Sequence, residues 1–297
     1  MSANPQVGDL RGVGPSLPYP VKATVTRARS AAWYVRSRGR SPSGLRILFY
    51  HRVSADRDEL AVHPRMFRRQ MDCLASAGYR VLDIGQVADL LESGETPERT
   101  IGLNFDDGCL DVAEHALPVL AEYGFRATVF IATGVTDGRA AFTWYKQQPP
   151  LLSWQEIVEL DRCGTLEFEA HTVTHPNLLA VDDRRAAAEI EESKRELESR
   201  LARPVTALCY PAGLFGARER ALAVKAGYRV AVSCEPGVNE PETDRFALRR
   251  RQIDSRDTLL DFRAKVGGGH DTPLPLRGAY RRFRYGEGRP AAASRAE

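Results

Sequence analysis

The sequence predicts an α/β fold built on parallel strands, either a barrel or an open sheet. Short apolar runs typical of buried strands alternate about seven times with longer segments whose apolar residues recur at helical spacing. A chain of 297 residues is long for an ordinary domain but normal for a single α/β barrel. Its 43% hydrophobic and 27% charged residues are typical of a globular protein with a full core.

Each predicted strand is a short apolar run bounded by turn or polar residues. The strands cover residues 45–50, 80–82, 101–105, 127–132, 166–170, 205–209 and 229–233. Helices are predicted between them at 64–77, 87–91, 112–122, 153–163, 182–201 and 217–226. Pro64 is typical of a first helical turn, and Ser153 with Glu156 forms a capping box. Residues 133–152 form the longest irregular connection, a length that usually indicates a functional or disordered loop.

Ionisable side chains follow three of these strands where each strand ends. Asp106 and Asp107 follow residues 101–105, His51 follows 45–50, and His171 follows 166–170. In parallel barrels the residues that carry chemistry lie at the C-terminal ends of the strands. His175 comes four residues after His171, a spacing that would put both imidazoles on one side of a helical turn.

Two imidazoles and one carboxylate make a three-ligand site with an open position, as a catalytic divalent ion requires. The second aspartate is then free to act as a base. Each motif alone has little specificity, since paired histidines and adjacent aspartates also occur in ordinary turns and caps.

Three motifs, in this order, resemble those of the polysaccharide deacetylases that share the NodB homology domain, carbohydrate esterase family 4. They lie at residues 104–108 (NFDDG), 171–175 (HTVTH) and 210–213 (YPAG). Residues 49–53 (FYHRV) and 127–130 (ATVF) are also similar to this family, so the resemblance covers roughly residues 45–265. It implies an irregular seven-stranded (β/α) barrel.

By this resemblance, Asp107, His171 and His175 bind a divalent metal and Asp106 is the general base. Two nitrogen ligands and one carboxylate favour Zn²⁺. The oxyanion that forms needs a backbone N–H, and because Pro211 has none, the amide of Ala212 is expected to supply it. Tyr210 and Pro211 are placed beside the substrate.

The chain departs from the family pattern at two positions. Many members have an arginine two residues before the proline to orient the base, whereas this chain has Cys209. An arginine of the run at 249–251 is expected to replace it, and Arg250 is assigned to the site. Many members also have a late Leu-x-His that supplies the general acid, and no such motif follows Ser233. His51 is expected to take this role, ahead of His270.

The expected function is metal-dependent hydrolysis of the N-acetyl amide of a sugar, polysaccharide or glycolipid precursor. Trp144, in the long connection, is expected to stack on a sugar ring, although a packed surface loop fits its sequence equally well. Two alternatives stay open, namely hydrolysis of a non-sugar linear amide and metal-retaining carbohydrate binding without turnover. No nucleic-acid partner is expected.

Charge is unevenly distributed along the chain, whose formal net charge is +3. Residues 1–46 carry eight basic side chains and one aspartate, so their net charge is +7, and residues 277–297 add +4, which leaves −8 for the remainder. We divide the chain into a basic N-terminal tail (1–44), a catalytic domain (45–270) and a basic C-terminal tail (271–297). Residues 1–20 are expected to be disordered and 21–40 to form a basic amphipathic helix.

The expected location is the cytoplasm. Five cysteines without a CxxC pair favour a reducing compartment, and the first 20 residues lack the pattern of a secretory signal. Basic ends are most often solvated tails, and the alternative is peripheral contact of the N-terminal tail with an anionic membrane at its inner face. In that case Trp33, Tyr34 and Val35 would insert.

Overall fold

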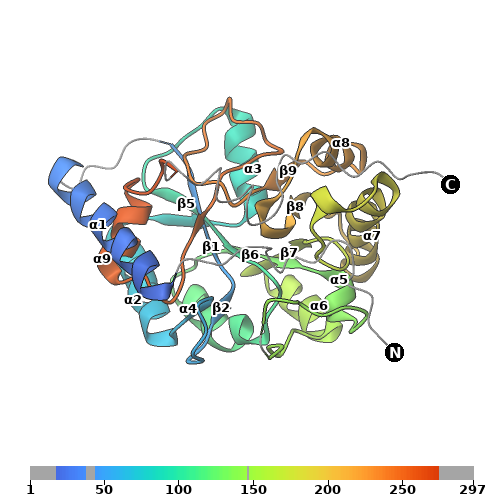
Figure 1. The fold of residues 1–297 in the computed structure, drawn as a ribbon, viewed down its shortest axis with the longest axis horizontal. Helices are drawn as coiled ribbons and strands as arrows, with labels where there is room; N and C mark the ends of the chain where they lie inside the picture. The colour runs from blue at the N-terminus through green and yellow to red at the C-terminus, as the bar shows by residue number, and fades with distance from the viewer. Residues whose placement is uncertain (1–17, 38–43, 146, 274–297) are drawn as a thin grey trace.

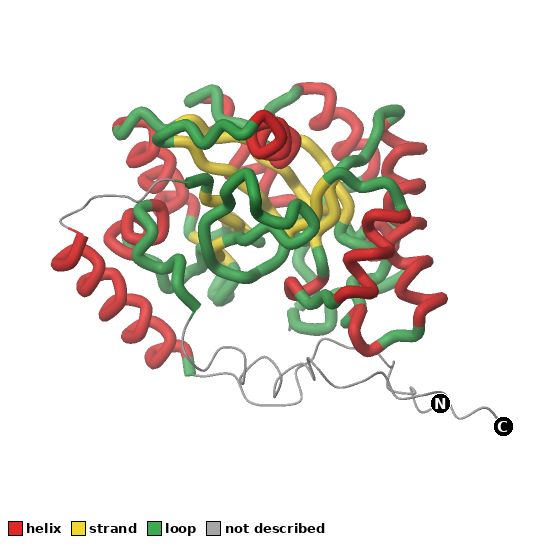
Figure 2. Tube along the Cα trace, turned by 90° about the horizontal axis from the view of Figure 1, so that it is seen from above, coloured by secondary structure: helices red, strands yellow, loops and turns green. Residues whose placement is uncertain are grey.

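The structure, a computed structural model, describes residues 18–37, 44–145 and 147–273 (Figure 1). The expected disorder of residues 1–20 and the basic C-terminal tail fall largely outside these residues. A curled parallel sheet lies at the centre, with helices on both sides of it when viewed from above (Figure 2). Its strand order is β10-β1-β5-β6-β7-β8-β9, and β4 joins it by pairing with β5.

All seven predicted strands are present, within two residues at each end. They are β1 (Arg46–Tyr50), β4 (Arg80–Leu82), β5 (Thr100–Phe105), β6 (Ala127–Ile131), β7 (Leu166–Ala170), β8 (Ala207–Cys209) and β9 (Val230–Val232). Three short strands were not predicted: β2 (Arg52–Val53), β3 (Ala61–Val62) and β10 (Arg251–Gln252). Two-residue strands have too short an apolar pattern to be recognised in a sequence.

The segment that ends in β10 joins the two edges of the sheet. Leu248 forms a parallel bridge with Val232 of β9, and three residues later Arg251 pairs with Leu48 of β1. The sheet therefore closes on itself irregularly, which confirms the predicted α/β barrel. This closure brings the arginine run at 249–251 across from the end of β5.

The predicted helices are present, and two of them begin where a start signal was predicted, α2 at Pro64 and α6 after Ser153. They are α2 (Pro64–Ser76), α3 (Ile84–Ser93), η1 (Val112–Ala116) with α4 (Leu117–Glu122), α6 (Trp154–Cys163), α7 (Asp183–Leu201) and α8 (Ala217–Lys225). Ser153 and Glu156 form the expected capping box. Not predicted were α5 (Thr133–Thr136), η2 (Leu178–Ala180), η3 (Pro211–Gly213) and α9 (Leu259–Val266).

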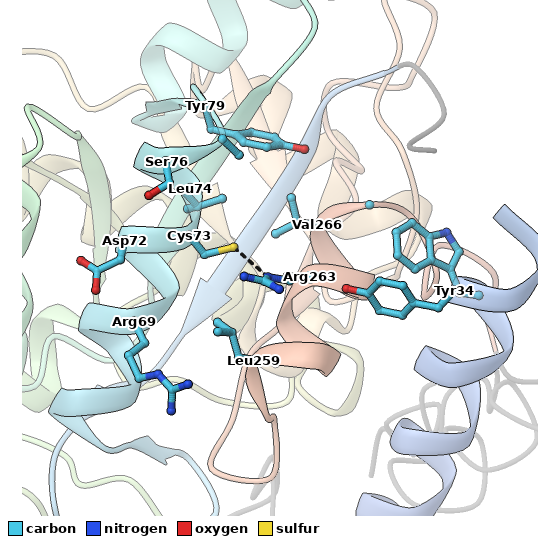
Figure 3. Close-up of a pocket in the computed structure, with 13 residues that line it drawn as sticks. Tyr34, Arg69, Asp72, Cys73, Leu74, Ser76, Tyr79, Leu259, Arg263 and Val266 are labelled. Carbon is cyan, nitrogen blue, oxygen red and sulfur yellow. Dashed lines mark hydrogen bonds between the residues drawn. The ribbon is translucent and has the colours of Figure 1, made fainter. Parts of the chain in front are cut away.

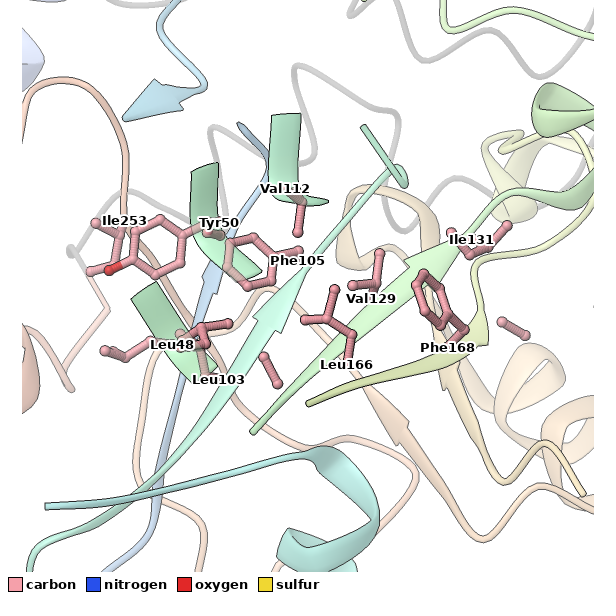
Figure 4. Packing of buried hydrophobic residues seen from close by; sticks show 14 of the residues in the cluster. Leu48, Tyr50, Leu103, Phe105, Val112, Val129, Ile131, Leu166, Phe168 and Ile253 are labelled. Carbon is pink, nitrogen blue, oxygen red and sulfur yellow. The ribbon is translucent and has the colours of Figure 1, made fainter. Parts of the chain in front are cut away.

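Alternate residues of the strands face two different cores, because successive side chains in a strand point to opposite faces. Leu48, Leu103 and Phe168 are among those that pack toward the outer helices (Figure 4). Ile47 and Phe130 belong instead to a second cluster, which includes Val87 and other apolar residues of α3. Both faces of the sheet are therefore covered by apolar packing.

The helix α1 (Tyr19–Ser37) confirms the basic helix expected at 21–40, except that residues 38–40 lie outside the described part of the chain. It docks on α9 through the buried carboxylate of Asp261, which accepts from Arg27 Nε at 3.0 Å and Ser30 Oγ at 2.7 Å. Trp33 lies against Gly267 and Gly269. The domain boundary at residue 45 stays a prediction, but α1 is held by the domain that follows it.

A pocket of about 550 Å³ opens where α1, α2 and α9 meet (Figure 3). Tyr34 of α1 faces Arg263 of α9 across it, and Arg263 Nε donates to Cys73 Sγ of α2 at 3.3 Å. Among the described residues, no helix is both long enough and apolar enough to cross a membrane.

We expect Gly267→Ala to disturb the docking of α1. The added Cβ would lie 2.4 Å from the indole ring of Trp33, although the φ of −82° at Gly267 suits any residue. Overpacking of this kind costs about 1–3 kcal/mol, so thermal unfolding should begin at a lower temperature. Trp33→Ala should remove the clash, and the double variant should be less destabilised than the sum of the two single changes. Strict additivity would contradict the contact.

Candidate active site

Asp106 and Asp107 point to different partners because the backbone turns sharply after β5. The amide of Asp106 still continues the sheet, donating to Tyr50 O at 2.9 Å, whereas Asp107 has a φ of 77° and Gly108 a φ of 69°. A Cβ at Gly108 would lie 2.5 Å from the side chain of Ile131, so only glycine fits. Two adjacent carboxylates are thereby available for separate roles.

Asp107 faces the two histidines. Its Oδ1 lies 3.8 Å from His171 Nε2 and 4.0 Å from His175 Nε2, and the two nitrogens are 3.0 Å apart. Zinc binds nitrogen and oxygen at about 2.0–2.2 Å, so ligand atoms on one ion lie less than about 4.2 Å apart. All three separations satisfy this limit, and all three residues are buried.

The histidines converge for a reason other than the predicted helical turn. Residues 171–175 form a bent loop in which Thr172 has a φ of 66° and His175 a φ of 54°. The carboxylate of Glu189, on α7, accepts from the amides of Val173 at 2.9 Å and Thr174 at 2.7 Å. The helical prediction is therefore wrong, because left-handed backbone positions and a buried carboxylate shape this loop.

The protonation of the two histidines suits a metal, whereas burial and the charge of Asp106 raise the pKa of Asp107, an effect that a bound cation would offset. His171 Nδ1 lies 2.7 Å from Cys209 O, so it donates there and leaves Nε2 as the ligand atom. Burial lowers the pKa of His171 to about 4 and that of His175 well below its usual value, which keeps both imidazoles neutral. Asp107 Oδ1 is buried and accepts no hydrogen bond from the described residues. A divalent cation fits these three groups.

Asp106 is held by Arg250. The guanidinium makes two hydrogen bonds to the carboxylate, at 2.7 and 2.9 Å, and its Nε donates to Ser233 O. Burial raises the pKa of Asp106, but the charge of Arg250 and its hydrogen bonds outweigh burial, so the net pKa lies below its usual value. Asp106 therefore stays ionised, as a base must.

The small side chain of Cys209 lies next to the contact between Arg250 and Asp106. The thiol lies 3.0 Å from Arg250 Nη2 and 3.7 Å from Asp106 Oδ2. Cys209 stands where the resembling family has its arginine, and its small side chain leaves room for an arginine that arrives from the closing segment. Of the run at 249–251, the structure places Arg250 against the base.

The other predicted site residues have different surroundings. Ala212 lies in η3 with a φ of 52°, beside the buried Pro211. Trp144 is half-buried, with its ring centroid 4.5 Å from that of His175. His51 is within reach of the charge of Asp106, and burial lowers its pKa. His270 instead contacts Ser30 of α1.

Tyr210 requires a correction. Its side chain is fully buried, its ring stacks on Phe215 at 4.6 Å, and its hydroxyl donates to Phe246 O. A ring covered in this way has no face for a sugar, so the prediction of substrate contact by this side chain is wrong. Tyr210 instead anchors the loop that presents Ala212.

Two aromatic residues of the long connection were not assigned to the site. Tyr145 donates from its hydroxyl to Asp107 Oδ2 at 3.1 Å. Phe142 meets the ring of His175 edge-on, with 5.6 Å between centroids. The sequence signal was the aromatic cluster at 142–145. It indicated a functional loop but not which side chains face the histidines.

Comparisons with known proteins point in one direction. The family model described as polysaccharide deacetylase matches residues 93–231, which include the triad, Asp106 and Ala212 but not His51 or Arg250. YxkH of Bacillus subtilis, named as a polysaccharide deacetylase, is 29% identical over 213 residues, 71% of this chain and 72% of that protein. A poly-β-1,6-N-acetyl-D-glucosamine N-deacetylase of Staphylococcus aureus is 24% identical over 232 residues, 75% and 78% of the two proteins.

Solved structures agree with these relatives. The deacetylase PplD of Streptococcus pyogenes, in complex with acetate, aligns with a TM-score of 0.65 and 25% identity over 75% of this chain and 99% of that chain. IcaB from Ammonifex degensii aligns with a TM-score of 0.67 and 23% identity, over 76% and 98%, and supports the fold.

We expect Arg250→Lys to shift the pH dependence of any activity that needs ionised Asp106. A lysine cannot make the bidentate contact, so burial would count for more and the pKa of Asp106 would rise. As the solution is acidified, the variant should therefore lose activity at a higher pH than the unaltered protein does. Rate profiles of Arg250→Lys and of Arg249→Lys, an exposed neighbour, test this. Superimposable acidic limbs would contradict the role of Arg250.

Proposed function

We propose that the chain removes acetyl groups from an N-acetylated sugar in a metal-dependent reaction, because residues 93–231 match the polysaccharide deacetylase family model and similar proteins are named as deacetylases. One observation carries this proposal. A carboxylate kept ionised by Arg250 lies directly beside a buried set of two imidazoles and a second carboxylate.

Asp107, His171 and His175 would hold the metal, and Zn²⁺ suits their two nitrogen atoms and one oxygen. When bound, such an ion acts as a Lewis acid and lowers the pKa of water to about 7. The hydroxyl of Tyr145 donates to the other carboxylate oxygen, Oδ2, and so fixes the orientation of Asp107.

The remaining steps belong to side chains and amides of this chain. Asp106 accepts the proton of the attacking water, and Arg250 keeps its carboxylate ionised and fixed in orientation. The N–H of Ala212 donates to the oxyanion that develops on the acetyl carbonyl. His51 takes the place of the family's late histidine motif, which is absent after Ser233; because burial lowers its pKa, it must first take up a proton, which it then donates to the departing amine.

The substrate class follows from the relatives and from Trp144. Its ring lies beside His175 and is only half-buried, which supports stacking of its exposed part on a sugar. Relatives named for action on poly-N-acetylglucosamine favour a polymer or glycolipid precursor over a non-sugar amide. Carbohydrate binding without turnover is the weaker alternative. Its main support was Cys209 at the position of the family's arginine, and Arg250 now makes the contact with Asp106 that this arginine would make.

We expect Asp106→Asn to abolish deacetylation while the metal is retained. An amide cannot accept the proton, and loss of a general base lowers the rate by about 10²–10⁴-fold. Acetate release from oligomers of N-acetylglucosamine, measured with the metal content of the same samples, tests this. His171→Ala is the matched control, since it should lose both metal and activity. Equal activity of Asp106→Asn and the unaltered protein would exclude Asp106 as the base.

We expect His51→Ala to reduce amide hydrolysis strongly but ester hydrolysis little. Its proton is needed by an amine leaving group, whereas an activated aryl acetate leaves without one. The ratio of the two rates therefore separates proton donation from positioning. His115→Ala, at an exposed histidine of η1, serves as control. Equal losses on both substrates would show that His51 only positions the substrate.

We further propose a cytoplasmic location with peripheral membrane contact through α1. Val35 is 81% exposed and Arg36 lies beside it in the last turn, which supports contact with an anionic surface. Lys22 and Arg27 are paired with Glu59 and Asp261, and Trp33 is packed, so the predicted insertion of Trp33 is corrected to packing on Gly267.

The membrane proposal predicts that the protein sediments with anionic vesicles at low salt and not with zwitterionic ones. Val35→Ser combined with Arg36→Gln should release it, because the exposed apolar and cationic groups are removed together. Val224→Ser, at an exposed apolar residue of α8, is the control. Protein that stays in the supernatant with anionic vesicles would rule the contact out.

A further inference from the structure

A second cavity lies away from the metal ligands, between α1, α9 and the segment that closes the barrel. Its volume is about 170 Å³. The lining includes Arg29 of α1, Lys265 of α9, Phe49 of β1 and, from the closing segment, residues 250–252, 254 and 256. None of Asp107, His171 and His175 lines it, and Arg250 is the residue that it shares with the candidate active site.

The lining of this cavity is strongly cationic. It holds five basic side chains and one carboxylate, that of Asp254. Asp106 and Asp257, which lie outside the lining, engage two of the cations, and Asp254 itself pairs with a third. The five groups are Arg29, Arg250, Arg251, Arg256 and Lys265.

Part of this lining is dry. Arg250 is 1% exposed, Lys265 6% and His270 3%, whereas Arg29, Arg251 and Arg256 are half-buried. Burial, together with the charges of Lys265, Arg251 and Arg29, lowers the pKa of His270 to about 3. Asp106, Asp254 and Asp257 offset three of the five cations, but the lining itself carries more positive than negative charge, so a bound anion lowers the repulsion among its cations.

Size and donor type limit what the cavity accepts. Pockets for drug-sized ligands measure about 300–1,000 Å³, so a cavity of 170 Å³ suits a small ion and excludes an oligosaccharide. Guanidinium groups present a planar fork of donors that matches oxyanions. A planar or tetrahedral oxyanion therefore fits both the volume and the lining.

We propose that this cavity binds a small oxyanion, either inorganic phosphate or the phosphate group of a small ester. The ion lies between Arg29 of α1, Arg251 of β10 and Lys265 of α9. Arg29 is also anchored there by its hydrogen bond to Thr272 O at 2.7 Å. Bound anion thus joins the N-terminal helix to the strand that closes the barrel, and it stabilises their docking.

Calorimetric titration of the metal-loaded protein with inorganic phosphate, and separately with glycerol phosphate, tests this at constant ionic strength set by sodium chloride. We expect one saturable site and a rise in Tm with phosphate concentration, because the ligand binds the folded state. Tighter binding of glycerol phosphate would identify an ester as the ligand, and binding of inorganic phosphate alone would identify the free ion.

Two matched pairs of variants locate the site. Val25→Glu places a carboxylate at the mouth of the cavity and should weaken binding by at least about tenfold, whereas Val25→Gln adds the same bulk without charge and should not. Val25 is 37% exposed, so neither change threatens folding. Arg29→Gln should weaken phosphate binding similarly, and Arg36→Gln, two turns along the same helix, should leave it unchanged.

Phosphate bound to the catalytic metal is the competing explanation, and His171→Ala distinguishes it. This variant should lose the metal and keep the phosphate site. Loss of phosphate binding in His171→Ala, equal binding by Val25→Glu and Val25→Gln, or the absence of a saturable site in the unaltered protein would each overturn the proposal.

Discussion

The buried ion pair between Arg250 and Asp106 is the interaction on which the site and the barrel both depend. Taking two charges out of water is expensive, and the expense is offset only when geometry and additional hydrogen bonds are good. Here Arg250 makes a bidentate contact with Asp106, donates to Ser233 O, and lies 4.2 Å from the ring centroid of Phe49. The pair ties the end of β5 to the segment that closes the barrel, so catalytic geometry and closure are fixed by the same bond.

Unusual backbone conformations concentrate around this pair. Asp107, Thr172, His175 and Ala212 are four of the six described residues other than glycine with positive φ. Such conformations cost of order 1–3 kcal/mol each and persist only where the surroundings impose them. Glu189 imposes the turn at the histidines through two amide hydrogen bonds, and Tyr145 holds the far oxygen of Asp107. The strain lies where ligand positions must be precise.

Sequence alone predicted what is local. The strands were recognisable as apolar runs, and Asp106, Asp107 and His171 could be placed because each follows a strand directly. The partner of Asp106 could be narrowed only to a run of arginines, since 144 residues separate the pair and closure of the barrel decides which arginine arrives.

Other features escaped prediction for similar reasons. The loop at 171–175 has a helical spacing of histidines but a shape set by Glu189 on another element. The helix α9 carries a capping box, Thr258 with Asp261, that could have been recognised. Its docking partner α1 could not, because that contact joins residues more than 200 positions apart.

The run at 249–251 shows how one repeated residue acquires three roles. Successive side chains of an extended segment point to opposite sides, so Arg250 faces inward while its neighbours face outward. Arg250 is buried against Asp106, Arg249 is exposed beside Gly237, and Arg251 lines the cationic cavity under α1. The register of this segment decides which of the three arginines lies against Asp106, since a shift by one residue would bring Arg249 or Arg251 to the place of Arg250. The bridges of Leu248 to Val232 and of Arg251 to Leu48 fix that register, and through it they fix the charge beside Asp106.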